Sequence, residues 1–254
     1  RQDPFILVEA HLEDLIRLGV EVWLYHTLIG ATLQPNGWRL QVEDCKWGTR
    51  RTVAVNAVVN AAGPWAADVA AVFGIQLPLV YVHGSMAVLE RSLVRSVVTR
   101  CAPPSMGDVV IPSGNACLVG STWHQLPHND PIEMDAVDWN TMMRTASTMV
   151  PEVTRVRVVR SFTGIRTHLT PPASAPSSNF ETSRDYAVIN HSERDRMYGL
   201  VTALGGKLVL YRYVAELVGD LVMHQLGLER PCQTRGAPLP YPEHPSGRML
   251  SDPR

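Results

Sequence analysis

The sequence predicts a mixed α/β (α+β) fold in which both ends of the chain build one unit and a mainly antiparallel sheet is inserted between them. Two observations predict the outer unit: a helical pattern followed by strands in the first 77 residues, and strands near residues 185–203 followed by a long helix. A third predicts the insert, because short apolar runs between residues 79 and 122 alternate with tight turns.

The first third of the chain carries clear helix and hairpin signals. Apolar residues recur at helical spacing from Pro4 to Leu18, with Asp3 as a capping residue and Gly19 as a left-handed stop. Pro35-Asn36-Gly37 is typical of a hairpin turn. The remaining expected elements are a strand over Val20–Tyr25, strands over 28–34 and 38–44, a strand buried on both faces over Thr52–Ala62, and a helix over Trp65–Phe73 closed by Gly74.

The middle and the end of the chain favour short strands and two helices. A loop rich in Pro, Ser and Ala over 168–182 interrupts the pattern. The expected elements are strands over 79–90, 94–101, 108–112 and 116–122, a helix over 133–149, strands over 155–166, 185–190 and 199–203, and a helix over Lys207–Leu226 that stops at Gly227.

Composition excludes several classes of function. The 254 residues are 45% hydrophobic and 19% charged with a net charge of −1, so we expect no nucleic-acid partner. The four cysteines form no Cys-x-x-Cys pair and no histidine pair has metalloprotease spacing, so we expect neither a metal site nor a disulfide framework. Apolar stretches fall short of the roughly 20 residues of a membrane span, which predicts a cytoplasmic protein or one peripheral on the cytoplasmic face of the membrane.

Two glycine turns are candidates for ligand binding. Val59 to Ala62 leads into Gly63-Pro64, and a buried strand that ends in this way places small backbone where ligands sit in open α/β sheets. Gly205-Gly206-Lys207 opens the last predicted helix, whose free N–H groups favour negative charge. Each turn is equally compatible with a purely structural role.

Three cations near the ends of predicted strands, Arg166, Arg184 and Lys207, would bind a small anion if they converge. His83 and His191 are possible proton acceptors, but ordinary structural histidines account for them as well, so neither enters the predicted site. Ser121-Thr122, after a strand and a glycine, is compatible with a turn that lines a substrate.

The order of these motifs resembles the FAD-dependent glycerol-3-phosphate dehydrogenases, and most of all the catalytic large subunit of the anaerobic enzyme. The resemblance extends over roughly residues 2–240. Its motifs are Asp3-Pro4-Phe5, Val59 to Gly63, Arg100-Cys101, Pro104-Ser105, Ile111-Pro112, Gly120-Ser121-Thr122, Gly164-Ile165-Arg166, His191 to Asp195, Gly199 to Thr202, Gly205 to Leu208 and Tyr211-Arg212.

The resemblance implies an FAD/NAD(P)-binding-type unit with an inserted D-amino-acid-oxidase-like substrate domain. It assigns residues 1–77 to the first part of the FAD-binding unit, 78–184 to the substrate domain, 185–230 to the return segment and helix, and 231–254 to a trailing segment. It implies oxidation of sn-glycerol 3-phosphate to dihydroxyacetone phosphate, with electrons passed through membrane-associated partner subunits to quinone. The implied substrate ligands are Arg166 (also catalytic), Arg184 and Lys207, and the implied FAD ligands are Ala62, Gly63, Gly164, Gly205, Gly206, Lys207 and Leu208.

The sequence departs from the family pattern at several places. The family's glycine-rich segment that binds the FAD pyrophosphate is not in this sequence, so we expect flavin binding to need that N-terminal segment. Met86 occupies the place of a histidine in aerobic relatives, Thr167 that of a proline, and Val209-Leu210 that of two threonines. Two alternatives therefore stay open: another FAD-dependent amino-acid or hydroxy-acid oxidoreductase, or a truncated chain without catalysis.

Overall fold

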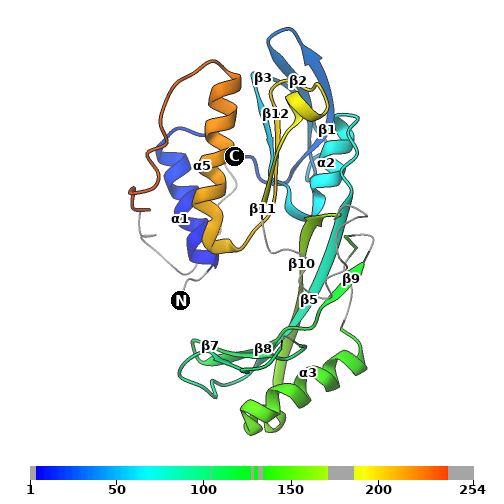
Figure 1. Cartoon of the computed structure of the whole chain (residues 1–254), viewed down its shortest axis with the longest axis vertical. Coiled ribbons are helices and arrows are strands. Elements are labelled where there is room, and N and C mark those ends of the chain that lie inside the picture. Colours follow the sequence, from blue (N-terminus) through cyan, green and yellow to red (C-terminus); the bar gives the residue numbers. More distant parts are fainter. Residues whose placement is uncertain (1–3, 104, 127–128, 131–133, 171–185, 240–254) are drawn as a thin grey trace. The chain divides into compact units, whose positions relative to one another are not determined.

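The computed structural model describes residues 4–103, 105–126, 129–130, 134–170 and 186–239 (Figure 1). The chain forms two compact units, one from residues 1–58 with 212–254 and one from residues 59–211. Helices and strands are mixed in the chain, as the sequence predicts. Within the described ranges, the helices are too short or too polar to cross a membrane.

The first unit contains a helix, a three-stranded antiparallel meander and the last helix of the chain. Helix α1 ends in a left-handed Gly19 (φ +75°), and Val20 N–H donates to the carbonyl of Leu15, which closes the helix as predicted. The hairpin at Pro35-Asn36 is also confirmed, because Gln34 pairs with Gly37. The elements are α1 (Pro4–Arg17), β1 (His26–Gln34), β2 (Gly37–Asp44), β3 (Arg50–Val55) and α5 (Tyr211–Gln225).

Two strand predictions in this unit are wrong. Residues Val20–Tyr25 form no strand, because Tyr25 takes a left-handed φ of +60°, and Val20 and Leu24 stay exposed without a partner strand. The run Thr52–Ala62 is two strands rather than one buried strand. Its first half is β3, an edge strand whose residues alternate between exposed and half-buried positions, and its second half is β4 (Val58–Asn60), which lies in another sheet.

The second unit contains two sheets. The larger has the order β10-β5-β8-β7-β6, with β9 also paired to β5, and the smaller has the order β11-β12-β4. Sequence reasoning missed β9 and overextended β6. The strands are β5 (Leu79–Leu89), β6 (Val98–Thr99), β7 (Val109–Ser113), β8 (Ala116–Gly120), β9 (His124–Leu126), β10 (Val158–Leu169), β11 (Tyr186–Asn190) and β12 (Leu200–Gly205).

Short helices complete this unit. Asp135 caps α3 by accepting a hydrogen bond from Asp138 N–H, and Gly74 (φ +73°) ends the segment after α2 as predicted. The helices are η1 (Gly63–Trp65), α2 (Ala66–Val72), α3 (Ala136–Met149), η2 (Pro151–Arg155), α4 (His191–Arg194) and η3 (Leu208–Leu210).

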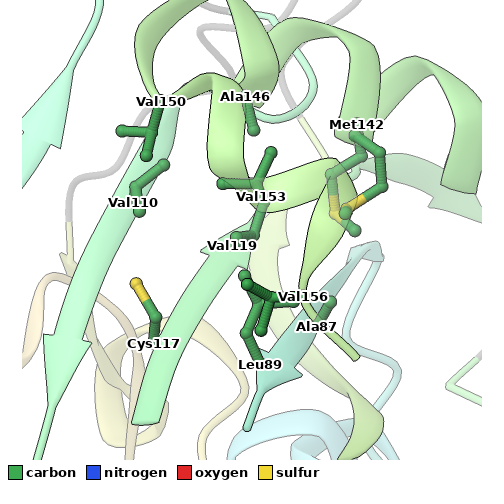
Figure 2. Packing of buried hydrophobic residues seen from close by; sticks show 11 residues of the cluster. Ala87, Leu89, Val110, Cys117, Val119, Met142, Ala146, Val150, Val153 and Val156 are labelled. Carbon is green, nitrogen blue, oxygen red and sulfur yellow. The ribbon is translucent and has the colours of Figure 1, made fainter. Parts of the chain in front are cut away.

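The main hydrophobic core lies between one face of the larger sheet and α3 (Figure 2). Leu89, Val119 and Met142 are fully buried, and burial of side chains of this size contributes about 1.5–3 kcal/mol each. The cluster comprises Ala87, Leu89, Val110, Cys117, Val119, Met142, Met143, Ala146, Val150, Val153 and Val156. This core fixes which face of the sheet is covered.

We expect Gly37→Ala to destabilise the first unit far more than Gly48→Ala. Both glycines have positive φ, but a Cβ at Gly37 would lie 2.1 Å from the Val55 carbonyl oxygen, whereas a Cβ at Gly48 meets nothing within 4 Å. The expected losses in unfolding free energy are roughly 3 kcal/mol or more and about 1 kcal/mol, measured by urea denaturation. Equal losses would show that the close approach of β2 to Val55 is not maintained in solution.

Candidate functional site

The ladder between β5 and β10 has one face that the core does not cover. In its antiparallel register, Arg166 lies opposite Val82, Gly164 opposite Gly84 and Phe162 opposite Met86. Residues directly opposite one another, and those two positions along, share one face of a sheet. Ala87 and Leu89 of the core are on the other face, so Arg166, Gly164 and Phe162 share the face away from that core.

The floor of this open face contains two glycines. The Thr122 carbonyl oxygen lies 3.0 Å from where a Cβ of Gly84 would stand, whereas Gly164 is uncovered. Gly84 and Gly164 form a cross-strand pair, and the space above Gly164 is empty to at least 4 Å from where a Cβ would stand. Gly164 is exposed, Arg166 is half-buried and Phe162 is 42% exposed. A flat patch of backbone beside a guanidinium group suits a planar or small anionic ligand.

The turn after β4 is held by a buried asparagine. Asn60, which is 2% exposed, donates from Nδ2 to the Ala66 carbonyl at 2.8 Å, and its Oδ1 accepts from Ala62 N–H at 3.3 Å. These bonds shape the turn through Ala62 and the left-handed Gly63 (φ +55°). Sequence reasoning noted this motif but missed that Asn60 organises it.

The second glycine turn follows β12. Gly205 and Gly206 have φ values of +66° and +82°, which only glycine adopts at little cost, and a Cβ at Gly206 would lie 3.3 Å from that of Tyr186. Lys207 and Leu208 are exposed. The predicted helix from Lys207 is corrected: η3 forms first and α5 begins at Tyr211, because the Leu210 N–H bonds to the Lys207 carbonyl in a tighter turn.

The two glycine turns and the open face with Arg166 belong to neighbouring elements of the second unit. Strand β10, with Gly164 and Arg166, contacts both η1, which begins at Gly63, and β12, which ends at Gly205. Ala62 and Lys207 directly adjoin these elements in the chain. Arg184 lies outside the described residues, and the convergence of the three cations stays a prediction.

The histidines named as possible proton acceptors are structural. His83 is completely buried and lies opposite Ile165 and His124, which places it on the face away from Arg166. His191 is also completely buried. Its Nδ1 bonds to Asp195 Oδ2 at 2.6 Å and its Nε2 bonds to Thr202 Oγ1 at 2.7 Å, so neither nitrogen is available to a ligand.

His191 ties the start of α4 to β12 through its bond to Thr202, and Asp195 holds its other ring nitrogen. Burial lowers the pKa of His191 below its ordinary value of 6.5, against the effect of the Asp195 hydrogen bond. Burial alone would raise the pKa of Asp195, but hydrogen bonds from Arg194 and His191 outweigh it and lower that pKa. Because a carboxylate only accepts hydrogen bonds, neutral His191 donates from Nδ1 and accepts the Thr202 hydroxyl proton at Nε2.

Similarity to known proteins identifies the family of the chain. The family described as FAD dependent oxidoreductase matches residues 1–212. The chain belongs to this family. It is similar to the A1 component of anaerobic glycerol-3-phosphate dehydrogenase from Haloferax volcanii, 31% identical over 95% of this chain and 43% of that protein, and to the corresponding component from Escherichia coli K12, 28% identical over 96% and 45%. This FAD dependent oxidoreductase chain therefore spans less than half the length of those relatives.

Solved structures establish the shared fold. Glycerol-3-phosphate dehydrogenase from Bacillus halodurans, complexed with FAD, superposes with a TM-score of 0.73 over 92% of this chain and 45% of that one, at 22% identity. Glycine oxidase from Geobacillus kaustophilus superposes with a TM-score of 0.59 over 89% and 54%, at 23% identity. The predicted D-amino-acid-oxidase-like fold and the FAD cofactor of the family are thus confirmed.

The described residues fit such a cofactor. Two turns present left-handed glycine backbone, at Gly63 and at Gly205-Gly206, and the sheet beside them has the glycine pair Gly84–Gly164, of which Gly164 is uncovered. The sequence shows only two separate glycines within predicted strands. Their pairing depends on the register of β5 and β10, which the sequence pattern does not contain.

We expect the unfolding free energy to fall as the pH drops below about 6.5. The pKa of His191 is lower in the folded protein, so the unfolded chain binds a proton at His191 more readily. The contribution of neutral His191 to stability is therefore fully present above pH 6.5 and is lost as the pH falls toward the lower pKa of the folded state. One such group contributes a slope of at most about 1.4 kcal/mol per pH unit. Urea denaturation between about pH 5.5 and 7.5 measures this slope. That range lies well above 3.8, the ordinary pKa of an aspartate, so protonation of Asp195 does not contribute to it.

His191→Gln cannot take up the proton, so its slope should be smaller than that of the wild type. His224→Gln is the matched control, because His224 is exposed on α5. An unchanged slope in His191→Gln would refute the assignment of the acid sensitivity to this residue.

Proposed function

We propose that this chain is the part of an FAD-dependent glycerol-3-phosphate dehydrogenase that binds sn-glycerol 3-phosphate beside FAD. The oxidation converts the C2 hydroxyl to the ketone of dihydroxyacetone phosphate, and electrons pass through membrane-associated partner subunits at the cytoplasmic face to quinone. The observation that carries the proposal is Arg166, which lies on the open face beside the Gly84–Gly164 floor. The two anaerobic dehydrogenase components that this chain resembles over 95–96% of its length support the substrate.

The proposal divides the chain by function as well. Residues 1–77 and 185–230 contribute to the FAD-binding unit, 78–184 to the substrate domain and 231–254 to a trailing segment. Ala62 and Gly63 would lie along the adenosine half of FAD, and Gly164, Gly205, Gly206, Lys207 and Leu208 around its isoalloxazine ring. When bound, FAD supplies the acceptor for the hydride that leaves C2.

The chain's own residues hold and orient the substrate. A guanidinium group binds a phosphate through two parallel hydrogen bonds, so Arg166 fixes both position and direction, and Arg184 and Lys207 would add charge. Arg166 would also stabilise negative charge that develops on the C2 oxygen as its proton leaves. Phe162 and Met86, which are paired on the same face, would border the ligand on one side of the floor.

A second candidate is an FAD-dependent amino-acid or hydroxy-acid oxidoreductase. Glycine oxidase of Geobacillus kaustophilus is 31% identical over 118 residues, which is 46% of this chain. The two candidates differ in the anion: a phosphate requires more positive charge than a carboxylate does. Dependence on a phosphorylated substrate therefore distinguishes them. If no flavin binds under any condition, the chain is not a working enzyme.

Flavin absorbance tests the proposal first. The purified chain is compared with a fusion that supplies the glycine-rich N-terminal segment of a relative, and glycerol 3-phosphate is then added without oxygen. We expect the fusion to bind flavin and the flavin bands to bleach. Arg166→Ala should reduce the rate of bleaching by about 100-fold or more, since a bidentate phosphate contact is lost. Flavin that responds to glycine but not to glycerol 3-phosphate would favour the second candidate.

Gly164→Leu tests the floor separately from folding. Because nothing lies within 4 Å of a Cβ at this position, the substitution should change the unfolding free energy by about 0.5 kcal/mol or less. A leucine would nevertheless occupy the space above the floor, so substrate bleaching should be lost. Gly236→Leu is the matched control, since it also has open space but lies in the other unit. Full bleaching in folded Gly164→Leu would mean that no ligand uses this face.

A further inference from the structure

The open face has a hydroxyl group at its edge, above Gly84. A Cβ built on Gly84 would lie 3.8 Å from Ser121 Cβ and 3.9 Å from Ser121 Oγ. That Cβ direction is the direction of the Arg166 side chain, because both positions belong to the same face of the β5–β10 ladder. The exposed Ser121 side chain thus overhangs the glycine floor.

The backbone beneath Ser121 is fixed to β5. Thr122, which is 2% exposed, donates from its N–H to the Ser85 carbonyl at 3.0 Å, and its Oγ1 accepts from Ser85 N–H at 3.0 Å. On the hidden face, Ser85 Oγ in turn bonds to Thr163 Oγ1 at 2.7 Å. The hydroxyls of Thr122, Ser85 and Thr163 are therefore satisfied within the protein, while that of Ser121 faces the surface.

A loop whose described residues are 100–103 and 105–108 holds Ser121 from the other side. Gly107 N–H donates to the Ser121 carbonyl at 3.2 Å. Gly107 lies directly against α3, since a Cβ there would be 2.3 Å from the Met142 carbonyl oxygen. The loop is thus held between α3 and the residue that overhangs the floor.

Arg100 closes this loop. Its Nε donates to Asp108 Oδ1 at 2.8 Å and its Nη2 to Ser105 Oγ at 2.7 Å, and Ser105 also donates to Asp108 from its backbone N–H and, at 2.9 Å, from its hydroxyl. The side chains of Arg100 and Asp108 are 29% and 20% exposed, so the pair is partly shielded from water. Charge-assisted bonds in such a place restrain a loop more strongly than exposed ones.

We propose that the Ser121 hydroxyl binds the terminal hydroxyl of the substrate, which in the ketone product is the hydroxyl next to the carbonyl group. The loop closed by Arg100 and Asp108 positions Ser121 over the floor. Arg166 lies one same-face position beyond Gly164, about 7 Å along the strand. A charged side chain and a neutral hydrogen-bonding side chain on neighbouring positions of one face suit a short polyol monophosphate. This inference rests on the proposed function and adds the group that recognises the end of the substrate remote from the phosphate.

The test uses two ketones that are not oxidised further, dihydroxyacetone phosphate and hydroxyacetone phosphate. Only dihydroxyacetone phosphate has the terminal hydroxyl. Calorimetric titration of the flavin-loaded protein should show about fivefold tighter binding of the first, which is the contribution of one net hydrogen bond. Ser121→Ala should remove this preference by weakening only the first ligand, and Ser121→Thr should keep it. Ser92→Ala, an exposed serine away from the floor, should leave it unchanged.

Arg100→Gln tests the positioning role. We expect it to reduce the preference about twofold to threefold while the affinity for hydroxyacetone phosphate stays constant, because only the placement of Ser121 changes. A purely structural role of Arg100 would instead weaken both ligands equally or neither. Asp108→Asn, which retains an acceptor for Ser105 N–H, should reproduce the effect of Arg100→Gln.

The outcomes separate this inference from the proposed function. If both ketone phosphates bind, Arg166→Ala abolishes both, and Ser121→Ala leaves the preference intact, the role of Ser121 is refuted while the function stands. If neither ketone phosphate binds the flavin-loaded protein, the proposed function fails and this inference fails with it.

Discussion

The long antiparallel ladder between β5 and β10 is the constraint on which the rest of the second unit depends. Successive side chains of each strand point to opposite faces of the sheet, so a register shift of one residue would move every side chain of a strand to the other face. The apolar rows at Ala87 and Leu89 pack against the α3 core and fix the register. Once these are buried, Arg166, Gly164 and Phe162 are on the opposite face. The chemistry of the open face is therefore a consequence of where the core lies.

Polar groups near this ladder follow the same division. On the hidden face, Ser85 and Thr163 satisfy one another, and His191 and Thr202 do so beside β12. Such groups cost about 1–3 kcal/mol each if buried without a partner, so their pairing is required for stability. On the open face, a half-buried arginine and an exposed serine remain at the surface. Buried networks thus hold the strands and turns, and the residues proposed to contact a ligand are attached to backbone that these networks restrain.

Much of the fold could be predicted from the sequence. Helical spacing gave α1 and α3, and glycine chemistry gave the stops at Gly19 and Gly74 and the hairpin at Pro35-Asn36. The errors have physical causes: apolar alternation in Val20–Tyr25 had no partner strand, and the valine-rich run after Thr52 crossed from one sheet to another. Of the site, Arg166 and both glycine turns were recognised by residue type, whereas the pairing of Gly84 with Gly164 and the position of Ser121 depend on register, which no local pattern contains.

The presence of glycine at the two positions of the floor, Gly84 and Gly164, has different physical explanations. Gly84 is required by the protein itself, because a Cβ would lie 3.0 Å from the Thr122 carbonyl oxygen. Among the described residues, Gly164 has no such neighbour within 4 Å and no left-handed φ, so neither packing nor backbone conformation demands a glycine there. A glycine within a strand weakens it, since it loses more entropy on folding and packs against nothing. A ligand that approaches the backbone of the sheet closely beside Arg166, as proposed above, would offset this cost.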